Sequence, residues 1–260
     1  MGWTSRIKAE LASALGEFAD ALWPPRCRLC GRHAEDGLAC IEHALPQAPP
    51  GERCGRCLAP LPRGVADGAR CADCRRHPPG WTRLVALGDY RAQPALREWV
   101  LAFKHGGRPD LARPLGSVLG RSALRAGVCT DPGAVLVPVP LHPRRRLERG
   151  YDQAARLAAE LECATGLPLV CALRRRRDTP PQGAPGARSR SANVSGVFGA
   201  RSNSARRVRA HPVWLVDDVV TSGATASECA RVLRSLGAAR VGVLALARAA
   251  PGRLGESELG

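Results

Sequence analysis

Short apolar runs alternate with helical patterns along residues 84–246, and this alternation limits the folds that the chain can adopt. Four runs have the length and composition of buried strands, at 84–90, 134–140, 213–216 and 241–246, and a fifth candidate lies at 168–173. Helical patterns separate them, at 94–104, 111–126, 151–165 and 226–236. Strands joined through helices form right-handed crossovers and a mainly parallel sheet. We therefore predict an α/β fold with helices flanking the sheet.

The segment 26–79 has a different composition, rich in Cys, Pro, Gly and Arg and without long apolar runs. It cannot bury enough apolar surface to build an ordinary core. Two Cys-x-x-Cys pairs have the spacing of a four-cysteine zinc ribbon, and we call them the downstream set: Cys54, Cys57, Cys71 and Cys74. We expect one tetrahedral zinc ion on this set, whose binding free energy stabilises the segment.

A similar group of three cysteines and one histidine precedes it, and we call this the upstream set: Cys27, Cys30, Cys40 and His43. One interpretation is a second zinc site, and the other is that these ligands interleave with those of the downstream set. Neither set leaves an open coordination position for a catalytic water, so the zinc is expected to be structural.

Four parts are expected along the chain, in the order 1–24, 25–79, 80–250 and 251–260. The first is an amphipathic helix, because its apolar residues recur at three- and four-residue intervals. The second is the Cys-rich zinc-binding module, the third is the α/β domain, and the last is a tail. Within the α/β domain, residues from about 174 to 212 are polar and basic, and they are predicted to form a flexible hood.

The formal net charge is +16, and Lys8 and Lys104 are the only lysines among the basic residues. An excess of positive charge raises the local concentration of phosphate-bearing partners, and both phosphorylated metabolites and nucleic acids qualify. Residues 1–23 lack the apolar core of a secretory signal, and no stretch reaches the roughly 20 apolar residues of a membrane span. We expect a cytoplasmic protein, in which thiols stay reduced and can bind zinc.

Residues 213–225 place a buried strand before two carboxylates and a hydroxyl-rich turn that opens a helix. Backbone N–H groups at a helix N-terminus bind phosphate, and hydroxyl groups add donors. We predict this role for Thr221, Ser222, Gly223, Ala224 and Thr225. Asp217 and Asp218 can accept hydrogen bonds from sugar hydroxyls, so the element as a whole predicts recognition of a ribose 5-phosphate. An ordinary helix cap accounts for the hydroxyls but not for two aspartates on an apolar strand.

The same residues resemble the 5-phosphoribosyl-1-pyrophosphate (PRPP) binding motif of type I phosphoribosyltransferases. From about Leu22 onward the chain resembles the ComF family of competence-associated proteins. Further motifs carry the resemblance: Trp23-Pro-Pro-x-Cys-x-x-Cys, Phe103-Lys-His-Gly-Gly-Arg-Pro, Val137-Pro-Val-Pro-Leu, Arg149-Gly-Tyr-Asp-Gln, and the spaced residues Arg177, Thr179, Gln182, Arg188, Asn193 and Phe198. Ser222 departs from the pattern, since a second threonine is common there, but it keeps the hydroxyl.

The resemblance implies a type I phosphoribosyltransferase-like domain at 80–250, with Asp217 and Asp218 on the ribose hydroxyls and residues 221–225 on the 5-phosphate. It also implies that the connection after the 134–140 strand and the hood hold pyrophosphate. The arginine candidates there are Arg144, Arg145, Arg149, Arg177 and Arg188. Magnesium would accompany PRPP and bridge the remaining charge.

Two functions follow from the resemblance. The first is a transferase that moves phosphoribosyl from PRPP to an acceptor, and the sequence does not identify this acceptor. The resemblance links the protein to DNA uptake in natural transformation. The alternative is a non-catalytic, PRPP-sensing accessory protein that binds single-stranded DNA through its arginines. Such DNA binding would be largely electrostatic and would weaken steeply with salt.

Overall fold

The computed structural model describes residues 22, 24–35, 37–46, 48–49, 51–66, 68–177 and 195–249. The predicted N-terminal helix, the middle of the predicted hood with Arg188, and the tail lie outside these residues, apart from Leu22 and Pro24. The chain divides into two compact units, Met1–Ala44 and Leu45–Gly260, and each is described by itself. Their boundary falls inside the range 25–79 that the sequence assigns to one Cys-rich module.

In the first unit, the described residues form irregular turns closed by a short 3-10 helix, η1 (Ile41–His43). Arg26 and His33 pair through an isolated antiparallel bridge. Cys27, Ala34 and Cys40 are buried together, with Leu29 packed against them. Among the described residues of this unit the apolar cluster is small, so a metal ion bound by its cysteines would add to its stability.

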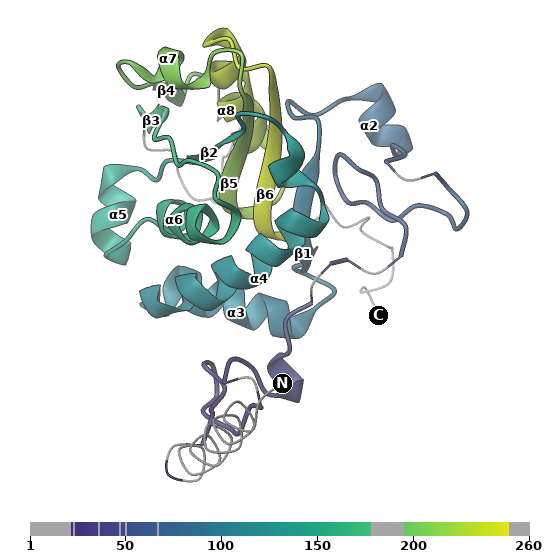
Figure 1. Ribbon diagram of the computed structural model, residues 1–260, viewed down its shortest axis with the longest axis vertical. Coiled ribbons are helices and arrows are strands. Elements are labelled where there is room, and N and C mark those ends of the chain that lie inside the picture. The colour runs from purple at the N-terminus through teal and green to yellow at the C-terminus, as the bar shows by residue number, and fades with distance from the viewer. Residues whose placement is uncertain are drawn as a thin grey trace, which may run out of the picture. The chain divides into compact units, whose positions relative to one another are not determined.

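A four-stranded parallel sheet forms the centre of the second unit, with the strand order β1-β6-β5-β2 (Figure 1). The strands are β1 (Leu84–Asp89), β2 (Val135–Pro138), β5 (Pro212–Val220) and β6 (Arg240–Arg248). All residues of β6 after Arg240 are buried, as expected of an interior strand covered on both faces. The predicted α/β fold class, with a Cys-rich segment before a mainly parallel sheet, is confirmed.

Helices cover the sheet, and α4 (Ala112–Arg125) packs closely on α6 (Gln153–Thr165). Glycines permit this approach, because a Cβ atom at Gly116 would lie 2.3 Å from Glu160 Cβ. Helix α8 (Ala224–Ser235) packs on the central strands through Ala226, Cys229 and Leu233. The other helices are α2 (Ala72–Arg76), α3 (Pro94–His105), α5 (Pro143–Arg149) and α7 (Ser204–Val208), with 3-10 turns η2 (Pro109–Leu111) and η3 (Val128–Thr130).

The fifth strand candidate, 168–173, does not extend the sheet as a regular strand. It contributes an isolated parallel bridge between Leu169 and Leu136, and the chain then enters β3 (Leu173–Arg175). Strand β3 pairs antiparallel with β4 (Phe198–Ala200), and the two form a separate ribbon. This ribbon is the base of the predicted hood. In the part of the chain that the structure describes, no helix has the length and apolar character needed to cross a membrane.

Candidate functional site

The turn that joins β5 to α8, residues 221–225, will be called the β5–α8 turn. It begins directly after Val220, the last residue of β5, and Gly223 is the N-cap of α8. Gly223 has φ +78°, in the left-handed region that side chains rarely adopt. A Cβ atom there would also lie 2.3 Å from the ring of Trp81. Glycine is therefore required at this position for both its backbone conformation and its close packing.

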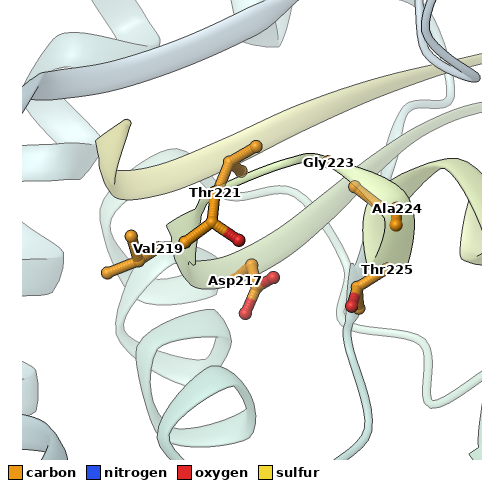
Figure 2. A pocket seen from close by; sticks show the side chains of 8 residues that line it. Asp217, Val219, Thr221, Gly223, Ala224 and Thr225 are labelled. Atoms are coloured by element: carbon orange, nitrogen blue, oxygen red, sulfur yellow. The ribbon is translucent and has the colours of Figure 1, made fainter. Parts of the chain in front are cut away.

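A small pocket lies at this turn, and Figure 2 shows the side chains around it. Its described lining consists of Asp217, Val219, Val220, Thr221, Gly223, Ala224, Thr225 and Ala226. Five of the seven residues predicted to bind the ribose phosphate thus line one pocket. Of the other two, Ser222 is exposed and its hydroxyl accepts a hydrogen bond from Ala224 N, whereas the Asp218 side chain is engaged elsewhere.

The two carboxylates of β5 have different surroundings. Burial raises the pKa of Asp217, and the adjacent Asp218 carboxylate raises it further, while Lys104 acts in the opposite direction. Asp218 is 8% exposed, and its Oδ2 lies 3.1 Å from Lys104 Nζ. Asp218 is therefore balanced by a cation, whereas the raised pKa of Asp217 favours its protonated form, and a cationic or hydrogen-bond-donating ligand would favour the carboxylate.

The sequence did not assign a role to Lys104, although it lies in the Phe103-Lys-His-Gly-Gly-Arg-Pro motif. It is at the C-terminal end of α3, which the Arg149-Gly-Tyr-Asp-Gln motif holds in place. The Tyr151 hydroxyl donates to Phe103 O, and Gln153 Nε2 donates to Lys104 O at 3.4 Å. Two motifs that are separate in sequence therefore cooperate to place an ammonium group beside the aspartates.

The structure places the arginine candidates differently from one another. Arg149 Nη1 donates to Gln153 Oε1 at 3.3 Å, which joins Arg149 to the network around Lys104. Burial lowers the pKa of neighbouring His105, and the positive charges of Arg149 and Lys104 lower it further. Positive charge is therefore concentrated at this end of α3. The remaining candidates, Arg144, Arg145 and Arg177, lie on α5 or just after β3, and Arg144 pairs with Glu148 of its own helix.

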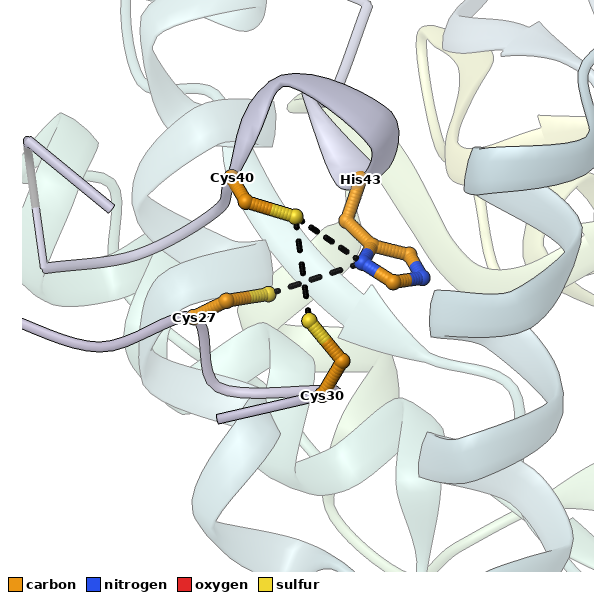
Figure 3. A group of neighbouring side chains, drawn as sticks. All are labelled: Cys27, Cys30, Cys40 and His43. Atoms are coloured by element: carbon orange, nitrogen blue, oxygen red, sulfur yellow. Dashed lines mark hydrogen bonds between the residues drawn. The ribbon is translucent and has the colours of Figure 1, made fainter. Parts of the chain in front are cut away.

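The upstream set closes on itself, as Figure 3 shows. Sulfur atoms bound tetrahedrally to zinc at about 2.3 Å must lie about 3.8 Å apart. Cys30 Sγ and Cys40 Sγ are 3.7 Å apart, and His43 Nδ1 lies 3.6 Å from Cys27 Sγ and 3.3 Å from Cys40 Sγ. These ligand atoms fit one tetrahedral zinc ion.

The downstream set also closes on itself, so the ligands of the two sets do not interleave. Cys57 Sγ and Cys71 Sγ are 3.6 Å apart, and Cys71 caps α2 by accepting a hydrogen bond from Cys74 N. Burial raises the pKa of Cys57 to about 11, and repulsion by the Cys54 thiolate raises it further. A divalent ion would remove that repulsion, and the set can hold zinc.

Comparison with known proteins found relatives in several bacteria. The chain is 32% identical to Competence protein F of Haemophilus influenzae over 200 residues, which cover 75% of this chain and 84% of that protein. It is 33% identical to DNA utilization protein YhgH of Salmonella typhimurium over 230 residues, covering 85% and 89% respectively. Competence protein ComFC of Bacillus subtilis is 30% identical over 150 residues, or 58% of each chain.

Among solved structures, the chain is similar to an allosteric regulatory enzyme of purine biosynthesis, with 21% identity, a TM-score of 0.39 and coverage of 56% of this chain and 30% of that chain. It is also similar to the glutamine PRPP amidotransferase of B. subtilis, with 21% identity, a TM-score of 0.35 and coverage of 55% and 30%. No protein-family model matches the chain. On the identity and coverage of its curated relatives, the chain belongs to the ComF family of competence and DNA-utilization proteins.

Proposed function

We propose that the β5–α8 turn binds the ribose 5-phosphate part of PRPP or a closely related ligand. The observation that carries this proposal is one pocket formed by the Asp217 carboxylate, two hydroxyl side chains and the first residues of α8. The first backbone N–H groups of a helix have no partner within the helix, and they can donate to a phosphate. Asp217 stands on the preceding strand, where it can accept hydrogen bonds from the ribose.

Lys104 places its ammonium group beside the buried carboxylate of Asp218. A ligand with a pyrophosphate group offers this ammonium a stronger partner than Asp218 alone, and Arg149 is connected to the same network. Magnesium prefers carboxylate and phosphate oxygens, so Asp217 and the ligand are the groups that would hold it. We assign Lys104 to charge balance at the leaving pyrophosphate.

If the protein is a transferase, the bond from ribose C1 to pyrophosphate breaks while an acceptor nucleophile bonds to C1. Charge then develops on the sugar ring as a cation and on the leaving pyrophosphate as an anion. Asp217 and Lys104 carry the charges that match these two changes, so positioning and electrostatics would supply the catalysis. The described residues do not indicate the chemical class of the acceptor.

The proposal is tested by calorimetric titration of PRPP with magnesium into the zinc-loaded protein. We expect saturable binding by the wild type, and binding at least about 30-fold weaker in Asp217→Asn/Asp218→Asn and in Lys104→Met, because each change removes charge-assisted contacts worth about 2 kcal/mol. Asp131→Asn is the matched control, since Asp131 pairs with Arg240 at the opposite ends of the strands. Absence of binding by folded wild type would rule out the proposal, as would equal binding by the variants.

The affinity for magnesium and PRPP is also expected to rise with pH. The pKa of Asp217 is raised in the free protein, and a ligand that donates hydrogen bonds or brings a cation favours the ionised form. Binding should therefore release a proton between pH about 5, where an ordinary aspartate is already ionised, and pH about 8, the raised pKa of Asp217 in the free protein. Titration in two buffers of different ionisation enthalpy measures this release, and Asp217→Asn should lack it. Equal proton release by wild type and variant would contradict the assignment.

The alternative function, a non-catalytic accessory protein that binds single-stranded DNA, is favoured by the names of the relatives and by the net charge of +16. It predicts binding of a labelled single-stranded oligonucleotide that weakens steeply with salt. Retention of this binding by Asp217→Asn/Asp218→Asn, without turnover of PRPP alongside any tested acceptor, would favour the accessory protein over the transferase.

A further inference from the structure

Arg248, the last residue of β6, connects the downstream set with the β5–α8 turn. Its Nη1 donates to Val220 O at 2.8 Å and to Ala249 O at 3.0 Å, and its Nε donates to Cys57 O at 3.2 Å. Cys57 belongs to the downstream set, and Val220 immediately precedes Thr221 of the turn. The Arg248 side chain therefore connects the backbone of Cys57, a predicted metal ligand, to the backbone of Val220, the residue before the turn.

The position of Arg248 is unusual for a cation. The residue is only 9% exposed, and its hydrogen bonds within the described structure all end on main-chain carbonyl groups. Removing a guanidinium from water is costly unless opposite charge lies nearby. Four thiolates on one zinc ion carry a net charge of about −2, and the downstream set would supply that charge beside Arg248.

Trp81 makes a second connection between the same two elements. It is 2% exposed, and its Nε1 donates to Arg56 O at 2.6 Å, within the Cys54-x-x-Cys57 pair. Its ring packs against Gly223, where an added Cβ atom would lie 2.3 Å away. The preceding residue continues this contact, since Gly80 N donates to Ser227 Oγ of α8 at 3.2 Å.

We propose that metal in the downstream set fixes the β5–α8 turn in its binding conformation through Arg248 and Trp81, so that metal and phosphoribosyl ligand stabilise each other's binding. Arg248 and Trp81 are positioning residues, because neither lines the pocket at the turn. Coupling between two binding sites is reciprocal. Loss of the metal must therefore weaken ligand binding, and bound ligand must raise the affinity of the downstream set for its metal. We expect the higher affinity to appear as slower release of the metal.

The experiment compares Arg248→Met, which keeps an apolar stem but removes the donors, with Arg248→Lys, which keeps the charge. All proteins carry Cys27→Ser/Cys30→Ser, so that the metal measured is that of the downstream set. Release of this metal to a chromophoric chelator is followed with and without PRPP and magnesium. Hydrogen exchange at residues 219–225 is followed without ligand.

PRPP is expected to slow metal release about 10-fold in the parent protein and to have little effect in Arg248→Met, with partial recovery in Arg248→Lys. Exchange at the turn should rise about 10-fold in Arg248→Met and on removal of the metal. Equal slowing in the parent and Arg248→Met would overturn the coupling, as would unchanged exchange at the turn.

The ligand part of this inference rests on the proposed function, and the exchange measurement does not. If the parent protein fails to bind PRPP, the proposed function falls, but exchange at the turn after metal removal still decides whether the downstream set positions it. If Arg248→Met fails to fold, the effect of PRPP on metal release by the parent protein decides the same point.

Discussion

A Gly223→Val variant is expected to lose about 3 kcal/mol of unfolding free energy and to bind PRPP at least about 30-fold more weakly. A left-handed backbone costs a side-chain-bearing residue roughly 1 to 2 kcal/mol, and forcing a side chain into a packed site costs roughly 1 to 3 kcal/mol more. Gly223 meets both conditions, with φ +78° and the Trp81 ring 2.3 Å from the position of its missing Cβ. Urea unfolding and calorimetric titration measure the two losses.

Gly166→Val is the matched control for this prediction. Gly166 also has a positive φ, of +71°, but nothing lies within 4 Å of an added Cβ atom. It should therefore show only the backbone cost, about 1 to 2 kcal/mol, with ligand binding unchanged. Gly223→Val should cost less stability in a Trp81→Ala background than in the wild type, because the shorter side chain leaves space for the valine. If both glycine variants lose equal stability and bind PRPP as the wild type does, packing of Trp81 on the turn has no role in the site.

The strand, the turn and the helix around Asp217 could be predicted from sequence because their signals are local. An apolar run, two carboxylates, a glycine and hydroxyl residues follow one another within thirteen positions. The spacing of the cysteines also predicted the ligands of the two sets, although it left open whether the sets interleave, and the structure separates them. In each case the residues that act together are close in the chain.

Lys104 and Arg248 were missed because their partners are distant in sequence. Lys104 meets Asp218 only after the end of α3 has come next to β5 in the folded chain. Arg248 looks, in the sequence, like the polar end of a buried strand. The motif around Lys104 was a usable signal, since it holds the only lysine after Lys8. For Arg248 the sequence offered no signal, because its side-chain hydrogen bonds end on main-chain carbonyls.

The candidate strand at 168–173 shows the same limit for the fold. Its apolar residues match a buried strand, yet Leu169 forms only an isolated bridge with Leu136 of β2. The chain instead forms regular pairs between β3 and β4, and β4 lies within the predicted hood. Periodicity indicates that a residue is buried, whereas the partner that it pairs with depends on the rest of the fold.

Loss of metal from the downstream set is expected to unfold the Cys-rich segment 51–79 of the second unit. Structural zinc contributes about 10 to 16 kcal/mol in small zinc-binding peptides, and the downstream set has little apolar core to replace it. Cys54→Ser/Cys57→Ser should therefore make the segment 51–79 sensitive to trypsin, which cleaves after arginines such as Arg53, Arg63 and Arg70. Limited proteolysis followed by mass spectrometry measures this change.

Cys163→Ser/Cys171→Ser is the control, because both cysteines are exposed and belong to neither set. It should retain the trypsin resistance and the metal content of the wild type. The parallel sheet should outlast the loss of metal, since its core of Leu215, Val243 and Leu244 is fully buried without any cysteine ligand. The metal-free variant should therefore keep a folded sheet while the segment next to the β5–α8 turn is cleaved. Trypsin resistance equal to that of the control would show that packing on Trp81 and Arg248 holds the segment without metal.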